Sequence, residues 1–277
     1  MNGTDLFNDL SEHVTLRITS CNTVLHPAGW MESKSHLNYD LWLIEEGAVQ
    51  LSVGEYMHTA LPGDLVLFYP HLAYTAANGE TPCRFIYMHF DFGLGEQKRI
   101  LDSFPLCGVV PARLVQEETE RLRHLFRTHQ HASGMSGMRL KGYLLLLMAR
   151  IMEAYGAGEY KGELAVDGAR QVHAGRLLLL RATIDYVRNN LHRPIRIEEL
   201  ADVAGMSEKY FIRYFKQALG VTPGQFIYQL RMNRAREMIY SGRYSIQQIS
   251  ALLGYPDPYS FSKAFKKHYK VPPSKFV

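Results

Sequence analysis

Residues 197–205 read IEELADVAG and residues 246–254 read IQQISALLG, so one pattern of apolar positions that ends in glycine occurs twice. Beyond the glycines the similarity continues through two phenylalanines and a lysine, with one residue added in the second turn: Phe211, Phe215 and Lys216 against Phe261, Phe265 and Lys266. A repeat at a fixed spacing indicates a duplicated structural unit. The sequence therefore predicts two copies of one helical unit in its last hundred residues.

Each copy is expected to form a helix, a short turn and a second helix, over residues 197–219 and 246–269. Gly205 and Gly254 stand where the chain leaves the first helix in a left-handed conformation, which glycine adopts without steric cost. Two helices joined by such a turn form a helix-turn-helix, the unit that many proteins insert into the major groove of DNA. The repeat thus predicts two DNA-reading units in one chain.

Capping residues predict where the helices of this region begin. Ser207 and Asp257 precede the second helix of each unit and can cap it. Between the units, Thr222 and Gln225 form a capping box at the start of a helix that runs to about Tyr240. A rod of about seventeen residues spans roughly 25 Å, so it can hold the two units near successive major-groove segments, which recur about every 34 Å.

The outward positions of the two second helices are polar or basic. A helix in the major groove offers its first turns to base edges and its flanks to phosphates. We therefore expect Arg213 to contact guanine, and we expect phosphate contacts from three lysines: Lys216, Lys266 and Lys267. The alternative is a solvated basic surface without a specific partner.

Charge divides the chain in the same way. The residues after Gly175 hold 17 Lys and Arg against 7 Asp and Glu, whereas the residues before them hold 14 against 20. An acidic front half joined to a basic back half makes the back half the candidate for nucleic-acid binding. The hydrophobic fraction of 47% and the charged fraction of 21% are those of an ordinary globular protein.

The front half reads as short alternating strands up to about Phe92, followed by helices over 114–129 and 139–155. Strands separated by Gly, Pro and Asn turns indicate a small β-barrel or sandwich. We expect an α+β multidomain protein: a β-barrel domain with two following helices over 1–155, a glycine-rich linker over 156–175, and an all-α domain of about seven helices over 176–277. The apolar stripe of the two helices, which includes Leu144 and Ile151, favours dimerisation.

Residues 177–277 closely resemble the AraC/XylS family of transcription regulators. The most specific stretch is the second unit, which runs from Gly254-Tyr255 through FSKAFKK at 261–267 to VPPS at 271–274. The front half resembles the cupin-type sensor barrel that often accompanies this domain. The family's base-contacting positions fall on six residues here: Lys209, Ile212, Arg213, Tyr259, Ser260 and Lys263. Ile212 is apolar where a polar residue is common, so its remaining role is contact with a thymine methyl.

The resemblance implies a homodimer that binds promoter DNA, responds to a small-molecule effector such as a sugar, and acts with RNA polymerase, commonly as an activator. Aromatic and hydrogen-bonding residues at barrel positions are the candidates for effector contact: His36, Trp42, Tyr74, Phe85 and Tyr87. Ordinary core packing is the alternative role for each of them. Neither the effector, the promoter, nor the choice between activation and repression can be read from the residues.

Catalysis is the rival function from another class, because cupin barrels include metal-dependent enzymes. The candidate ligands, among them His36, His71 and His89, are scattered along the sequence, and His36-Leu37-Asn38 stands in place of the cupin His-x-His pair. We therefore predict no metal, no cofactor and no enzymatic activity. A DNA-binding protein without an effector is the second alternative.

Cysteine content and hydropathy indicate the compartment. The three cysteines, Cys21, Cys83 and Cys107, lie far apart and form no metal-binding or redox motif. The longest apolar stretch, around 143–148, is far short of the roughly 20 residues that a bilayer needs, and the acidic start is unlike a secretory signal. We expect a cytoplasmic protein without a membrane partner.

Overall fold

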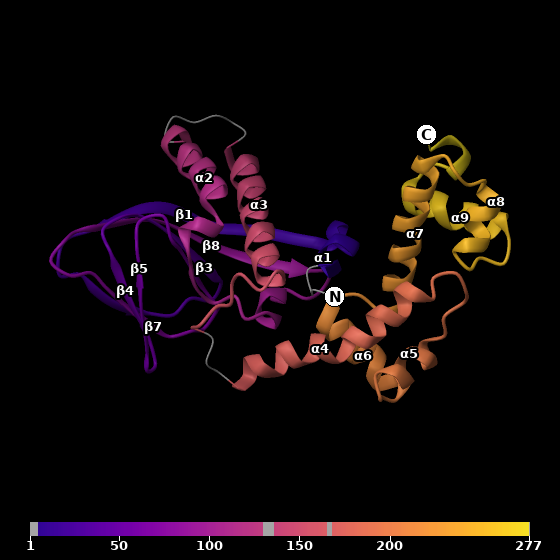
Figure 1. The fold of residues 1–277 in the computed structure, drawn as a ribbon, viewed down its shortest axis with the longest axis horizontal. Coiled ribbons are helices and arrows are strands. Elements are labelled where there is room, and N and C mark those ends of the chain that lie inside the picture. Colours follow the sequence, from indigo (N-terminus) through magenta and orange to yellow (C-terminus); the bar gives the residue numbers. More distant parts are fainter. Residues whose placement is uncertain (1–4, 130–135, 165–167, 277) are drawn as a thin grey trace. The chain divides into compact units, whose positions relative to one another are not determined.

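The computed structural model describes residues 5–129, 136–164 and 168–276. The chain forms two compact units (Figure 1). The first unit contains Val14–Gly93 and Lys98–Ala174, and the second contains Asp5–His13, Leu94–Gln97 and Gly175–Val277. Among the described residues, no helix is both long and apolar enough to cross a membrane.

Two antiparallel sheets make up the first unit, as the alternating strands predicted. The five-stranded sheet has the order β1 (Val14–His26), β8 (Cys83–Leu94), β3 (Tyr39–Glu46), β6 (Leu65–Phe68) and β9 (Gly108–Val110). The four-stranded sheet has the order β2 (Met31–Lys34), β7 (Tyr74–Ala77), β4 (Val49–Val53) and β5 (Tyr56–Ala60). The predicted cupin-like fold is confirmed.

The strand register decides which side chains share a face of the five-stranded sheet. In β3 and β8, Asp40 lies opposite His89 and Trp42 lies opposite Tyr87. Directly opposed residues of an antiparallel pair point to the same side. Trp42 also contacts Tyr74 of the other sheet, with ring centroids 5.5 Å apart, so this side is the interior between the two sheets.

Helices α2 (Gln116–His129) and α3 (Ser136–Gly156) follow the sheets, near the ranges predicted for them. They lie side by side against β1 and β8, on the side away from β4, β5 and β7 (Figure 1). The apolar stripe expected to favour dimerisation is in fact buried within this unit: Leu144, Leu147, Met148 and Ile151. The exposed apolar side chains of α3 are others, namely Met138, Leu145 and Leu146.

The segment 156–175, which we expected to be a linker, packs in part within the first unit and in part forms a helix. Tyr160 and Leu164 are buried in the first unit, where the Tyr160 hydroxyl donates to the Leu106 carbonyl oxygen at 2.8 Å. Helix α4 (Gly168–Asn189) then begins inside the predicted linker. The glycine content of this segment gave no sign of Tyr160 and Leu164, which pack within the first unit.

The second unit is helical. After α4 come α5 (Ile197–Val203), α6 (Glu208–Leu219), α7 (Pro223–Ser241), α8 (Ile246–Leu252), α9 (Pro258–Tyr269) and the 3₁₀ turn η4 (Pro273–Lys275). The pairs α5–α6 and α8–α9 lie within the two predicted helix-turn-helix ranges. Gly205 and Gly254 have φ values of +65° and +68°, the left-handed conformation predicted for both turns.

The caps were predicted with one exception. Thr222 and Gln225 form the expected capping box at the start of α7, and the Asp257 carboxylate accepts from the Ser260 N–H. Ser207 occupies the N-cap position of α6, but its side chain accepts no capping hydrogen bond. The predicted start of α6 after Ser207 is thus correct, but the predicted capping by the Ser207 side chain is wrong.

Each helix-turn-helix has its own aromatic core, and α7 contributes to both. In the first helix-turn-helix (α5–α6), Phe215 packs against Phe226 of α7, with ring centroids 5.6 Å apart. In the second helix-turn-helix (α8–α9), Phe261 and Phe265 belong to one buried cluster with Met232 and Met238 of α7. The four phenylalanines that the repeat shares are all fully buried.

Three short segments complete the description. The 3₁₀ turns η2 (Ile100–Ser103) and η3 (Ala112–Leu114) belong to the first unit. Helix α1 (Asp5–Asp9) and the turn η1 (Ser11–His13) belong to the second, where the Asn233 side chain donates to the Asp9 carbonyl oxygen at 2.9 Å. No sequence pattern had placed these first residues against α7.

The two turn glycines offer a matched test of the repeat. An added Cβ at Gly205 meets no atom within 4 Å, whereas at Gly254 it comes within 2.7–2.9 Å of the Arg193 backbone. Gly205→Ala should therefore lower the free energy of unfolding by about 1 kcal/mol through backbone strain alone, and Gly254→Ala by roughly 2–4 kcal/mol because overpacking adds to the strain. Urea unfolding of the full chain, followed by circular dichroism, measures both. Equal losses would contradict the packing of Arg193 on this turn.

Candidate nucleic-acid interface and sensor pocket

Helix α6 has one buried and one exposed side. Phe211, Tyr214 and Phe215 face the core, which leaves the predicted base-contacting residues outside. Lys209 and Arg213 are exposed, and the Ile212 side chain is 36% exposed. An exposed apolar side chain between two cations suits contact with a thymine methyl group. The three residues share one accessible surface.

Tyr210 lies on the same surface and was missed by the sequence reasoning. Its side chain is 45% exposed, and the Arg213 guanidinium stands 5.5 Å from the centroid of its ring. Such a contact is attractive and limits the positions that the guanidinium can take. The i, i+3 spacing of Tyr210 and Arg213 could have predicted this contact.

Helix α9 presents the corresponding residues of the second unit of the repeat. Tyr259 is 78% exposed and Lys263 is exposed. Ser260 differs from them because its hydroxyl donates to Asp257 at 2.8 Å while its N–H donates to the same carboxylate at 2.7 Å. These hydrogen bonds lower the pKa of Asp257 and engage the Ser260 hydroxyl in the helix cap. Base contact by Ser260 stays a prediction, and it would compete with the cap.

The three predicted phosphate-binding lysines have different surroundings. Lys266 and Lys267 are exposed in the last turn of α9. Lys216 is half-buried, and its ammonium group forms an ion pair with Glu96 at 2.8 Å. A phosphate would therefore have to compete with Glu96 for Lys216, while Lys266 and Lys267 carry no such ion pair among the described contacts.

The predicted effector-binding residues lie together between the two sheets, where they form a packed cluster. Trp42 stacks on Phe85 with ring centroids 4.4 Å apart, and Tyr74 stacks on Phe68 at 4.0 Å. Trp42, Tyr74 and Phe85 are each at most 3% exposed. Their burial accords with the alternative role of core packing, and their contact with an effector stays a prediction.

The half-buried residues beside this cluster include two histidines that looked scattered in the sequence. Tyr87 lies 5.1 Å from His89 between ring centroids, and His89 lies 4.4 Å from His36. Asp40 completes the group, since its carboxylate lies within 3.5 Å of both imidazoles. Burial lowers the pKa of His36, and the Asp40 carboxylate opposes that shift. The register of β3 against β8, which the sequence does not fix, brings Asp40 and His89 together.

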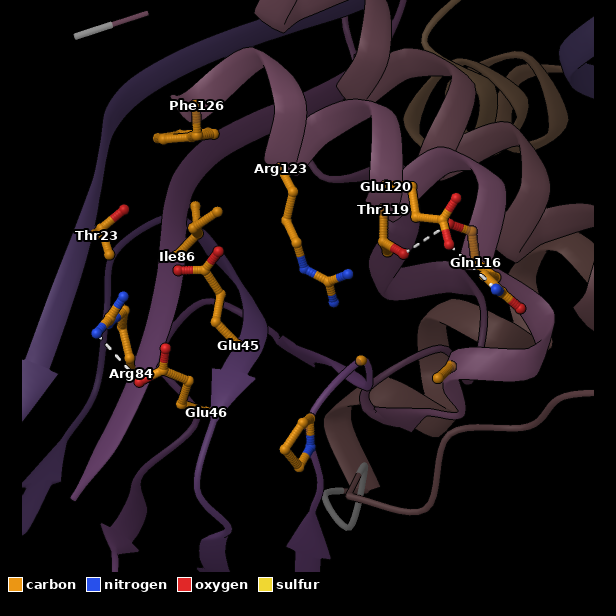
Figure 2. Close-up of a pocket in the computed structure, with 13 residues that line it drawn as sticks. Thr23, Glu45, Glu46, Arg84, Ile86, Gln116, Thr119, Glu120, Arg123 and Phe126 are labelled. Carbon is orange, nitrogen blue, oxygen red and sulfur yellow. Dashed lines mark hydrogen bonds and ion pairs between the residues drawn. The ribbon is translucent and has the colours of Figure 1, made fainter. Parts of the chain in front are cut away.

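A pocket lined largely by polar residues lies on the other side of the five-stranded sheet, beneath α2. Figure 2 shows the Arg123 side chain pointing from α2 toward this space, with Glu45 and Ile86 on the facing strands. The pocket measures about 680 Å³. Arg84 lines it too and pairs with Glu46 at 3.1 Å. None of the five predicted effector residues lines it: Trp42, Phe85 and Tyr87 point to the opposite side of this sheet, and Tyr74 belongs to the other sheet.

Comparison with known proteins assigns both parts of the chain to families. Residues 30–148 match the family described as "AraC-like ligand binding domain", and residues 200–277 match "Helix-turn-helix domain". An uncharacterized HTH-type transcriptional regulator of Haemophilus influenzae is 34% identical over 97 residues, which are 35% of this chain and 31% of that protein. The Msm operon regulatory protein of Streptococcus mutans is 20% identical over 86% of this chain and 84% of its own length.

One solved structure with a comparable sequence match is a transcriptional regulator with an AraC-type DNA-binding domain from Chromobacterium violaceum. It is 29% identical over 37% of this chain and 91% of that chain, with a TM-score of 0.34. The chain spans between 31% and 37% of the length of the first three curated relatives it matches. With a ligand-binding domain followed by a helix-turn-helix domain, both of the matched families, the chain belongs to the AraC family of transcription regulators.

Proposed function

We propose that this protein is a sequence-specific, DNA-binding transcription regulator whose first unit responds to a small molecule. The observation that carries the proposal is the pair of exposed, basic helices α6 and α9 within one compact unit. Helix α7 joins the two helix-turn-helix units and, with 19 residues, spans about 28 Å. That length is comparable to the roughly 34 Å between successive major-groove segments on one side of DNA.

Sequence is read by hydrogen bonds to base edges, and affinity comes mainly from phosphate contacts. Arg213 can donate two hydrogen bonds to guanine, and Tyr210 beneath it limits its motion. Lys266 and Lys267 stand at the far end of α9, where a phosphate backbone would pass beside the helix. Arg213 is therefore the residue for specificity, and the lysines are the residues for general affinity.

Arg213→Ala and Lys267→Ala should separate these two roles. Against a duplex selected from a random library, Arg213→Ala should weaken binding by about 10–100-fold while leaving affinity for random DNA nearly unchanged. Lys267→Ala should weaken both and reduce the salt dependence by about one charge. Fluorescence anisotropy across salt concentrations measures these effects, with Arg243→Ala, exposed after α7, as the matched control. If Arg213→Ala lowered the affinity for the selected duplex and for random DNA equally, Arg213 would have no role in specificity.

The pocket beneath α2 is the effector site that we favour. It is lined by charged groups of both signs, including Glu45, Arg84 and Arg123, and it is large enough for a sugar or a comparable polar molecule. Among the relatives are a lactose operon transcription activator and a xylose operon regulatory protein, which favours a sugar as the effector here. The packed rings between the sheets offer less room.

A thermal-shift screen of sugars and small carboxylates on the full chain should identify a stabilising ligand. Arg123→Ala should reduce the affinity for that ligand by about tenfold or more, because it removes a charged hydrogen-bond donor from the pocket. Arg17→Ala, an exposed arginine on β1 that does not line the pocket, should leave the affinity unchanged. If the ligand still bound to Arg123→Ala but no longer bound to Tyr87→Ala, the effector site would lie between the sheets instead.

We further propose that the protein is a cytoplasmic homodimer that acts with RNA polymerase and has no catalytic activity. Leu145 and Leu146 of α3 are 42% and 53% exposed. Together with Leu125 and Tyr143 they line an open groove. Two adjacent exposed leucines on one helix are the surface that a second copy would cover.

Leu146→Glu should weaken self-association by about tenfold or more, because a carboxylate would be buried at the centre of the contact. Sedimentation equilibrium over a range of concentrations measures this change. Met57→Glu on β5, where the methionine is 73% exposed, is the matched control and should leave the association intact. An unchanged dimer in Leu146→Glu would move the interface away from α3.

A further inference from the structure

Three side chains with metal-binding atoms converge at the interior edge of the β3–β8 pair. The Nε2 atom of His36 lies 3.4 Å from one oxygen of Asp40, and Nε2 of His89 lies 3.5 Å from the other. One ligand atom from each residue falls within 4.8 Å of the other two. Around a tetrahedral ion with ligand bonds of about 2.0–2.1 Å, neighbouring ligand atoms stand roughly 3.3 Å apart, so the spacing to Asp40 needs little adjustment.

The Asp40 carboxylate lacks full compensation for its burial. Its residue is 1% exposed, and Oδ2 accepts from the Trp42 indole N–H at 2.8 Å. Oδ1 is buried and accepts no hydrogen bond. A buried carboxylate oxygen without a partner is costly unless a cation or donor lies against it. This oxygen lies 3.5 Å from Nε2 of His89, and that contact is not a hydrogen bond.

A surrounding group holds one of the two histidines, His89, in the orientation that a metal requires. The Ser20 hydroxyl lies 2.7 Å from Nδ1 of His89, which leaves Nε2 directed at Asp40. Nε2 of His36 lies 3.1 Å from the Tyr74 hydroxyl, which also donates to Asp40 at 3.4 Å. Metal-binding histidines characteristically make a hydrogen bond through the ring nitrogen that does not bind the ion. Ser20 stands in this relation to His89.

We propose that His36, Asp40 and His89 bind a divalent first-row transition-metal ion, with Ser20 as the positioning residue for His89. Two neutral imidazoles and one carboxylate form a ligand set that zinc, iron, manganese and cobalt accept. The ion supplies the positive charge that the buried carboxylate lacks. Three protein ligands leave a further coordination position open, beside the Tyr74 hydroxyl. This site is separate from the DNA-binding surface and from the pocket beneath α2, so its test does not depend on either.

The test is metal binding by the full chain after dialysis against a chelator. Titration with Zn²⁺ in a calorimeter should show one ion bound per chain. Titration with Co²⁺ should give the visible absorption of a low-symmetry, four- or five-coordinate ion. Asp40→Asn preserves the size of the side chain and an acceptor for the Trp42 N–H, yet should lower the Zn²⁺ affinity at least about 100-fold; Ser20→Ala should lower it by about 10–100-fold.

Controls separate this site from weak binding by other histidines. His58→Ala, on β5 and outside the cluster, should bind Zn²⁺ like the original chain. Near-ultraviolet circular dichroism, which reports the packing of Trp42, verifies that each variant is folded. A folded original chain that binds no stoichiometric Zn²⁺ would overturn the proposal. So would binding that is unchanged in Asp40→Asn and in His89→Ala.

Discussion

The helical unit that carries both helix-turn-helix pairs depends on α7 being buried at both of its ends. Phe226 near its start completes the first aromatic core, and Met232 and Met238 nearer its end complete the second. Between them, the Arg231 guanidinium donates to the Arg193 carbonyl oxygen at 2.6 Å and stands 5.7 Å from the Tyr255 ring. Burial lowers the pKa of Arg231. One helix thereby fixes α6 and α9 in a common frame, and recognition by two helices requires such a frame.

The first unit shows a different division between packing and binding. Its interior is filled by stacked rings of Trp42, Phe85, Tyr74 and Phe68, whereas open, charged space lies on the outer side of the sheet beneath α2. Aromatic residues at barrel positions could serve either purpose, and only the contacts distinguish the two. The polar exceptions are His36, Asp40 and His89, which contact one another beside these rings.

The sequence predicted the features that depend on residues close together in the chain, and it did not predict those that depend on contacts between distant segments. The helix-turn-helix units, their glycine turns and the caps at Thr222 and Asp257 depend on neighbours a few residues away, and they were predicted. The His36–Asp40–His89 cluster and the pocket beneath α2 depend on strand register and on helix packing between distant segments. The packing of residues 160–164 was not predicted for the same reason, since Tyr160 and Leu164 find their partners at Leu106 and Cys107, more than fifty residues earlier.

The two helix-turn-helix units are similar without being equivalent. The turn between α8 and α9 is one residue longer than that between α5 and α6, and α9 begins with an Asp257 cap where α6 has none from Ser207. Helix α6 presents Lys209, Ile212 and Arg213, whereas α9 presents Tyr259, Ser260 and Lys263, so the two units offer different side chains to DNA. A DNA sequence read in this way has a direction: its two halves cannot be exchanged, and inverting it relative to a gene presents the protein with a different target.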